Sequence, residues 1–222
     1  MARTKMPIPT LRRIPRYLRL SEELLRAGIV HVSSAELAER LGFTPSQVRQ
    51  DFSALKEIYG ISADGQQGYG YRADSLRTNM ERILRLSEEK SCIWIGVGNL
   101  ALALAHNFDF KRCGVRPEAA FDILPEKVGT TLRTLSGEIP IYHVDSLERY
   151  CTERCPRMAI LTCPPAAAQN VADILTHAGV TGIWNLTNVD IRVPEEAELE
   201  NVHLSDSLMT LACRVRPDAD CP

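Results

Sequence analysis

The stretch Gly96-Val97-Gly98-Asn99-Leu100-Ala101 follows directly on the short apolar run Cys92-Ile93-Trp94-Ile95. A segment rich in alanine and leucine then continues to about Asn107, so the pattern predicts a strand, a tight turn and a helix in succession. A G-x-G-x-x-G/A motif in that context is typical of a dinucleotide-binding Rossmann domain, in which the helix N-terminus binds phosphate.

Three positions of this motif have separate expected roles. Gly96 permits the tight turn, Gly98 leaves room for a pyrophosphate, and Ala101 lets the helix lie close to the sheet. We therefore expect the whole loop to contact a dinucleotide. The expected contacts are Gly96, Val97, Gly98, Asn99, Leu100 and Ala101.

An acidic residue is expected at the end of the second strand, and the run Glu118-Ala119-Ala120-Phe121-Asp122 supplies it. Asp122 lies 26 positions after Gly96, more than the usual ~20, and a loop over residues 109–116 would account for the excess. Its carboxylate would accept a hydrogen bond from a ribose 2′-hydroxyl and repel a 2′-phosphate, which favours NAD(H) over NADP(H). The alternative is a surface aspartate that begins a turn.

Further alternating strands and helices follow. Strands are predicted at 139–144, 158–162 and 182–185, helices at 146–154 and 166–178, and a last short strand around Val202 and Leu204. Ligands bind outside the carboxyl ends of such strands. The remaining predicted cofactor contacts are Ile123, Thr162, Cys163, Pro164 and Asn185.

A terminal helix is predicted over residues 205–216, with an apolar face formed by Leu208, Met209, Leu211, Ala212 and Val215. It has no evident place in the sheet. We expect it to dock on another surface, such as a second subunit; packing on its own domain is the alternative.

The N-terminal part predicts a helix-turn-helix. A helix over residues 10–27 ends at Gly28, Ser33 or Ser34 caps a second helix, and Gly42-Phe43 forms the turn. Thr44 caps a third helix, with Pro45 in its first position. The Gly- and Tyr-rich stretch 59–71 predicts a hairpin wing around Asp64-Gly65, and residues 74–87 predict a linker helix.

The third helix carries residues suited to reading DNA. Arginine pairs with guanine and glutamine with adenine, while serine and threonine reach phosphates. The predicted DNA contacts are Arg12, Arg13, Ser33, Ser34, Thr44, Ser46, Gln47, Arg49, Gln50, Lys56, Tyr69 and Tyr71.

Charge supports this division of the chain. The 222 residues are 45% hydrophobic and carry a net charge of -2, which is ordinary for a folded protein. Residues 1–90 hold 15 basic and 11 acidic residues, net +4, whereas residues 91–222 hold 11 and 17, net -6. A basic segment before an acidic body indicates a phosphate-bearing partner, and a solvated tail is the alternative. We expect a DNA-binding domain at 1–88, a Rossmann domain at 89–204 and a dimerisation helix and tail at 205–222.

No membrane, catalytic or metal function is predicted. Apolar runs fall short of the roughly 18 residues that span a bilayer, and the first ten residues lack the apolar core of an export signal, so we expect a cytoplasmic protein. The seven cysteines match neither a disulfide framework nor zinc spacing and predict buried free thiols. The histidines are scattered without evident carboxylate partners.

The arrangement as a whole resembles the bacterial redox-sensing transcriptional repressors of the Rex family, along nearly the whole chain from about Ile8 to Val215. The markers are Pro15-Arg16-Tyr17-Leu18-Arg19, Ser33-Ser34-Ala35-Glu36-Leu37-Ala38, Gln47-Val48-Arg49-Gln50-Asp51-Phe52-Ser53, Gly68-Tyr69-Gly70-Tyr71, Gly96-Val97-Gly98-Asn99-Leu100, Ala120-Phe121-Asp122 and Ile139-Pro140-Ile141-Tyr142-His143. The resemblance implies a homodimer on double-stranded operator DNA, with C-terminal helices exchanged between subunits. NADH would release the DNA and NAD+ would allow binding.

Three departures stand out. Asn107 occupies a position that is usually Tyr in that family, His203 one that is often Asp, and the wing is about six residues longer. With an arginine corresponding to Arg16 or Arg19, the first two positions resemble the network linking nicotinamide state to DNA binding. A divergent DNA-binding paralogue with a weak or lost NADH response is therefore one alternative, and His203 would add pH sensitivity. A small NAD-dependent oxidoreductase is the other alternative.

Overall fold

The computed structural model describes residues 6–61 and 70–215. Its internal contacts divide the chain into two compact units, Met1–Glu88 and Glu89–Pro222.

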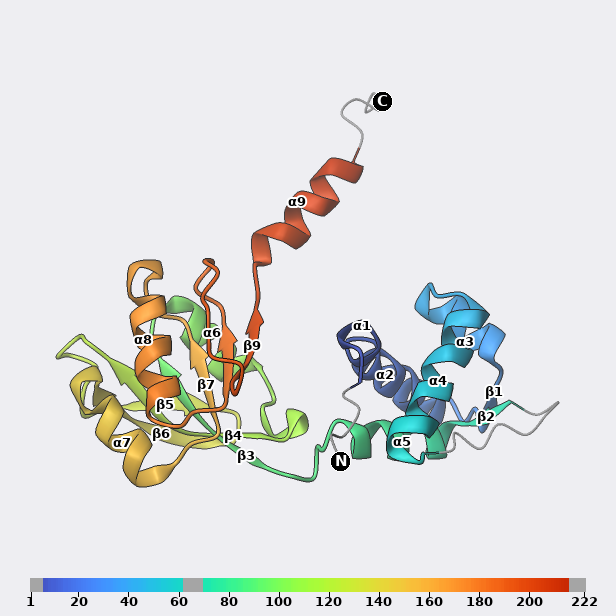
Figure 1. Ribbon diagram of the computed structural model, residues 1–222, viewed down its shortest axis with the longest axis horizontal. Helices are drawn as coiled ribbons and strands as arrows, with labels where there is room; N and C mark the ends of the chain where they lie inside the picture. Colours follow the sequence, from blue (N-terminus) through green and yellow to red (C-terminus); the bar gives the residue numbers. More distant parts are fainter. Residues whose placement is uncertain (1–5, 62–69, 216–222) are drawn as a thin grey trace. The chain divides into compact units, whose positions relative to one another are not determined.

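The first unit is helical with a small two-stranded sheet (Figure 1). Its described elements are α1 (Ile8–Leu11), α2 (Ile14–Arg26), β1 (His31–Val32), α3 (Ser34–Leu41), α4 (Pro45–Tyr59), β2 (Tyr71–Arg72) and α5 (Ala73–Ile83). β1 and β2 pair antiparallel. One side of each longer helix faces a common core, which includes Ile14, Tyr17, Leu24, Leu37, Val48, Leu55, Leu76 and Met80.

The helix-turn-helix is built as the sequence predicts. Ser33 caps α3 in a reciprocal capping box, since its hydroxyl accepts from the Glu36 N–H and its own N–H donates to the Glu36 carboxylate. Gly42 ends α3 in the left-handed conformation, at φ 67°. Thr44 then caps α4, whose first residue is Pro45.

Two boundaries in this unit differ from expectation. The helix predicted over 10–27 is two helices, because Pro15 lacks an N–H and favours a new start near Ile14. The linker helix ends at Ile83 rather than residue 87. The hairpin expected around Asp64-Gly65 lies outside the described residues.

The second unit is a doubly wound α/β domain. Its described strands are β3 (Lys90–Ile95), β4 (Val115–Asp122), β5 (Thr131–Thr134), β6 (Gly137–His143), β7 (Met158–Leu161), β8 (Gly182–Asn185) and β9 (Glu198–Asn201). Its helices are α6 (Asn99–Asn107), α7 (Leu147–Arg154), α8 (Pro165–His177) and α9 (Leu204–Arg214), with short 3-10 turns η1 (Lys111–Cys113) and η2 (Val144–Ser146).

In the described part of the sheet the strand order is β5-β6-β4-β3-β7-β8-β9, and only the edge strand β5 is antiparallel. The six parallel strands follow the Rossmann order, in which the winding reverses between β3 and β7. The Gly96 loop leaves β3 at that reversal.

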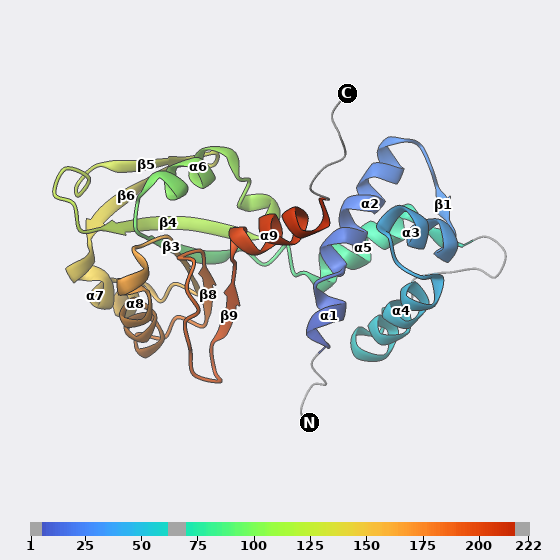
Figure 2. The same cartoon turned by 90° about the horizontal axis from the view of Figure 1, so that it is seen from above.

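Both faces of the sheet are covered. Along β3, Cys92 and Trp94 join the core beneath α6, whereas Ile93 and Ile95 join the core beneath α7 and α8. Figure 2 shows α6 on one side of the sheet and α7 and α8 on the other. This two-sided burial explains why β3 is a continuous apolar run, and it confirms the α/β fold class predicted from sequence.

Two predictions in this unit are wrong, and one strand was not predicted. Val202 and Leu204 do not form the last strand: β9 ends at Asn201, which pairs with Asn185, and Leu204 begins α9. The expected loop over 109–116 contains η1 and the start of β4. β5 was not predicted, because a four-residue edge strand gives little periodic signal.

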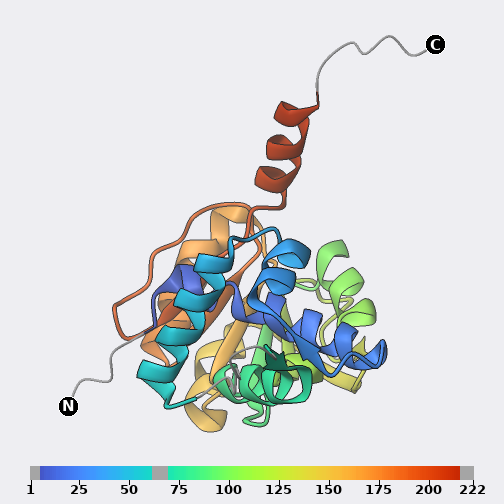
Figure 3. The same ribbon diagram turned by 90° about the vertical axis from the view of Figure 1, so that its right-hand side faces the viewer.

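α9 leaves the sheet after β9 and extends away from it (Figures 1 and 3). None of its described residues is buried, and Leu204, Leu208, Met209, Leu211 and Val215 are 56–66% exposed. Exposed apolar stripes of this kind are typical of interaction surfaces. Over the described ranges, no helix is long and apolar enough to cross a membrane.

Candidate functional site

The loop after β3 requires glycine at Gly96 for a steric reason. Its φ is 89°, and a Cβ there would lie 2.7 Å from the Cα and N atoms of Cys163, which follows β7. The two loops thus meet at the reversal of winding. At Gly98, by contrast, a Cβ would meet no atom within 4 Å, so this side of the loop is open. No described side chain caps α6, which leaves its first N–H groups for a ligand.

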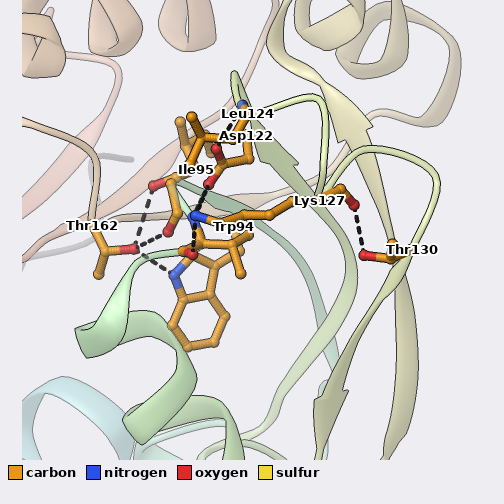
Figure 4. A network of polar contacts seen from close by, with 9 residues as sticks. Trp94, Ile95, Asp122, Leu124, Lys127, Thr130 and Thr162 are labelled. Atoms are coloured by element: carbon orange, nitrogen blue, oxygen red, sulfur yellow. Dashed lines mark hydrogen bonds and ion pairs between the residues drawn. The ribbon is translucent and has the colours of Figure 1, made fainter.

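Asp122 stands beside this loop at the end of β4 (Figure 4). Its carboxylate accepts from the Val97 N–H at 2.7 Å and from the Leu124 N–H at 3.0 Å. Burial acts to raise the pKa of Asp122, but these two bonds and Lys127 lower it below its usual value. The group is therefore an ionised acceptor at neutral pH.

Lys127, which was not predicted, links the loop after β3 to Asp122 at the end of β4. Its ammonium donates to the Val97 carbonyl at 2.8 Å and lies 3.2 Å from the Asp122 carboxylate (Figure 4). The Thr130 hydroxyl donates to the Lys127 carbonyl. A lysine five residues after the strand carries no sequence motif of its own, so pattern reasoning had no means of finding it.

Thr162 also acts on the loop. Its hydroxyl accepts from the Trp94 indole at 2.7 Å and donates to the Gly96 carbonyl at 2.6 Å. Its neighbour Cys163 is buried, and Pro164 is exposed. Ile123, beside Asp122, is 61% exposed and free to contact a ligand. These residues therefore gather at the edge that the sequence assigned to a cofactor.

Asn185 lies at the same end of the sheet, but its side chain is already hydrogen-bonded within the domain. It is 1% exposed, and its amide donates to the Val189 carbonyl and to Asn201 while its oxygen accepts from Thr187. The geometry gives it a role in joining β8 to β9.

Two other sequence interpretations need correction. Carboxylate partners exist for His203, whose Nε2 lies 2.9 Å from Asp190, and for His143, whose Nδ1 lies 3.1 Å from Asp145. Among the cysteines, Cys92, Cys151 and Cys163 are buried, but Cys113, Cys155 and Cys213 are exposed. Within the described ranges, no group of three or more His, Cys, Asp and Glu could hold a metal ion.

In the first unit, α4 presents the expected polar surface. Ser46, Arg49, Gln50 and Lys56 are exposed, as is Arg12 before α2. The Arg49 guanidinium donates to the Ser34 hydroxyl at 3.4 Å, and the Thr44 hydroxyl accepts from the Gln47 N–H. This exposed face of α4 carries hydrogen-bond donors and a positive charge, the features that a helix reading the major groove uses.

Three predicted DNA contacts are engaged in contacts within the first unit. The Arg13 guanidinium and the Gln47 amide both donate to Asp51, a buried carboxylate on α4 that was not singled out from sequence. Tyr71 packs edge-on against Phe52, and burial raises the pKa of its hydroxyl. Tyr69 lies outside the described residues.

A helix-turn-helix unit joined to a Rossmann unit with an open phosphate-type loop defines a nucleotide-responsive DNA-binding regulator. Comparison with known proteins agrees with this class. Residues 5–53 match the family model described as "Putative DNA-binding protein N-terminus", and residues 87–189 match the "CoA binding domain" model. Coenzyme A and NAD share an adenosine diphosphate moiety, so the second match supports the loop rather than one ligand.

The closely similar relatives are more specific. The redox-sensing transcriptional repressor Rex of Clostridium tetani is 44% identical over 91% of this chain and 91% of its own length. That of Caldicellulosiruptor bescii is 42% identical over 94% and 91%. This chain belongs to the Rex family of redox-sensing transcriptional repressors.

Solved structures give the same result. RSP, a Rex-family repressor, was crystallised in complex with β-NAD+ and operator DNA, and that structure superposes with a TM-score of 0.84 at 38% identity, covering 95% of this chain and 93% of that one. RSP in complex with β-NADH gives 0.82 at 36% identity, over 95% and 94%.

Proposed function

We propose that this chain represses transcription by binding double-stranded operator DNA, and that NADH releases it while NAD+ permits binding. The observation that carries this proposal is that one chain holds both features. α4 has an exposed polar face, and an open glycine loop lies where the winding of the sheet reverses. The RSP complexes with NAD+ and operator DNA and with NADH support both ligand classes.

The cofactor is NAD(H), bound with its phosphates at the Gly98 side of the loop and the N-terminus of α6. Bound there, the nicotinamide cofactor would supply a redox-dependent charge and shape rather than chemistry on a substrate. Asp122, already holding Val97 and Leu124, retains acceptor capacity for a ribose hydroxyl. Its negative charge disfavours the 2′-phosphate of NADP(H).

The acting form is a homodimer in which α9 docks on a second subunit. This proposal rests on the exposed apolar stripe of α9, with Leu208 66% and Leu211 56% exposed. The similarity to known repressors favours a regulatory rather than an enzymatic role. A cytoplasmic location follows from the proposed access to DNA.

The direct test of DNA reading is Arg49→Ala. A guanidinium that pairs with a guanine edge contributes about 1–3 kcal/mol, so the variant should bind its preferred duplex roughly 5- to 150-fold more weakly, with relaxed preference at one base pair. The duplex is one selected by the wild-type chain from a random pool. Wild-type affinity in the Arg49→Ala variant would exclude the assigned role.

A second candidate is DNA binding with a weakened NADH response. Asn107 favours it, because its amide donates to the Ala103 carbonyl within α6 and is thus engaged locally. His203 is likewise engaged with Asp190. Asn107 and His203 are two of the three departures from the family pattern.

A further inference from the structure

Four hydrogen bonds from three side chains converge on one carboxylate in the helix-turn-helix. Arg13 donates through Nε to Oδ2 of Asp51 at 2.7 Å and through Nη2 to Oδ1 at 2.6 Å. The Tyr17 hydroxyl donates to Oδ2 at 2.8 Å, and the Gln47 amide donates to Oδ1 at 3.1 Å. Each oxygen therefore accepts two bonds.

The carboxylate at the centre of the cluster lies in the core, and its donors Arg13 and Gln47 are half-buried. The side chain of Asp51 is 1% exposed and that of Arg13 is 19% exposed. Tyr17 is also buried, with its ring 5.9 Å from Phe43 and 5.2 Å from Phe52. Burial and the bond to Asp51 raise the pKa of Tyr17, so its hydroxyl stays a donor. A buried carboxylate without these donors would be strongly destabilising.

The donors come from both sides of the motif. Arg13 and Tyr17 belong to the start of α2, whereas Gln47 and Asp51 lie one turn apart on α4. Beside them, Arg16 donates to the Leu41 carbonyl and stacks 4.3 Å from the Phe43 ring centroid, at the turn before α4. The polar cluster thus fixes the position of α4 against α2 with directional bonds, which apolar packing alone does not supply.

We propose that Asp51 is a positioning residue for DNA reading: it orients α4 and withdraws Arg13 and Gln47 from the DNA, so that Arg49 and Gln50 read the bases. This inference rests on the proposed DNA-binding function. It reassigns two residues that their chemistry alone would place on phosphate and base edges.

The test is Asp51→Asn, which keeps the shape but loses the charge and one acceptor group. We expect affinity for the selected duplex to fall at least tenfold, while affinity for a scrambled duplex does not fall. Because Arg13 is no longer neutralised, the slope of log K against log salt should steepen by up to about 0.9. NADH affinity, which belongs to the other unit, should not change.

Arg13→Lys distinguishes a contact of Arg13 with Asp51 from a contact with DNA phosphate. This test does not depend on whether Asp51→Asn folds. Lysine keeps the charge but cannot form the two-pronged contact with Asp51. A loss of discrimination between the duplexes supports the inference. Wild-type discrimination in this variant would identify Arg13 as a simple phosphate contact and overturn it.

Lys56→Gln is the matched control, because Lys56 is exposed on α4 and is expected to contact phosphate. It should weaken binding equally on both duplexes and lower the salt slope by about 0.9. If Asp51→Asn behaves in this uniform way, Asp51 has no role in reading and the inference fails. A wild-type chain that binds both duplexes equally overturns the proposed function itself, and the inference falls with it.

Discussion

Gly96 and Gly98 belong to one loop but meet different demands. Gly96 has a φ of 89° and lies against the backbone of Cys163, whereas Gly98 has a φ of -89° and faces open space. Gly96→Ala should lower the free energy of unfolding of the second unit by about 1–3 kcal/mol from the backbone strain alone, with the contact adding to it. Thermal and denaturant unfolding measure this loss.

Gly98→Ala is the control for that substitution. It should leave the unfolding free energy within about 1 kcal/mol of wild type but weaken NADH binding, because the methyl group occupies the space assigned to phosphate. The account of this loop is wrong if Gly98→Ala binds NADH with wild-type affinity, or if Gly96→Ala unfolds like the wild type.

Among single residues, those that belong to a motif of known spacing could be predicted from the sequence. The loop and Asp122 were predicted because their spacing follows from the geometry of a strand, a turn and a helix. Asp51 and Lys127 were missed because their importance depends on donors far away in sequence or on a backbone carbonyl that only the fold brings near. An acidic residue inside a predicted DNA-reading helix is a signal that could have led to Asp51, but it was not used.

At the scale of the elements, none of the described residues of α9 is buried against its own unit. Leu208→Asp places a charge in the middle of the exposed apolar stripe. If this face is covered in a homodimer, the substitution should weaken dimerisation at least tenfold, because burying an unpaired charge is costly. Sedimentation equilibrium measures the dimer constant.

Thr210→Asp is the matched control, since helical geometry places Thr210 on the side of α9 opposite Leu208. It should leave the dimer intact. Equal effects of the two substitutions, or no effect of Leu208→Asp, would contradict the proposed docking face.

The start of α9 carries a pH-dependent contact. The hydrogen bond to Asp190 raises the pKa of His203. Desolvation lowers this pKa, while the negative charges of Asp190 and Asp206 raise it further, so that the pKa lies above its usual value. Because the folded pKa is raised, the stabilisation is complete below about pH 6.5 and is lost as pH rises through the folded value. His203→Gln should therefore be less stable than wild type at pH 6 and equal to it by pH 9.

Unfolding curves of wild type, His203→Gln and Asp190→Asn across this pH range make the measurement. Asp190→Asn should abolish the same pH dependence, since it removes the charge that raises the pKa of His203. A difference between wild type and His203→Gln that grows with pH would have the wrong sign for this ion pair.

Element prediction succeeded where caps and buried periodicity coincide. Ser33, Gly42 and Thr44 fixed α3 and α4, and the apolar run of β3 fixed the centre of the sheet. Element prediction failed at the edges of the sheet, where β5 and β9 are short and half-exposed. There, hydrogen bonding to the neighbouring strand, rather than a hydrophobic pattern, determines which residues form the strand.

For the molecule as a whole, the net charge of -2 is the sum of a basic and an acidic half. The basic half contains the exposed face of α4 that we propose reads DNA, and the acidic half contains the glycine loop and Asp122. Binding to DNA should accordingly depend steeply on salt, whereas binding of a dinucleotide held by backbone N–H groups should depend on it less.

The central claim is that one chain couples these two units. The measurement is a titration of the wild-type chain on its selected duplex with NADH and, separately, with NAD+, at one stated salt concentration. Coupling requires that the two cofactors differ in affinity for the DNA-binding state. We expect NADH to release the duplex and NAD+ to retain it; a complex that responds to neither cofactor would contradict this coupling.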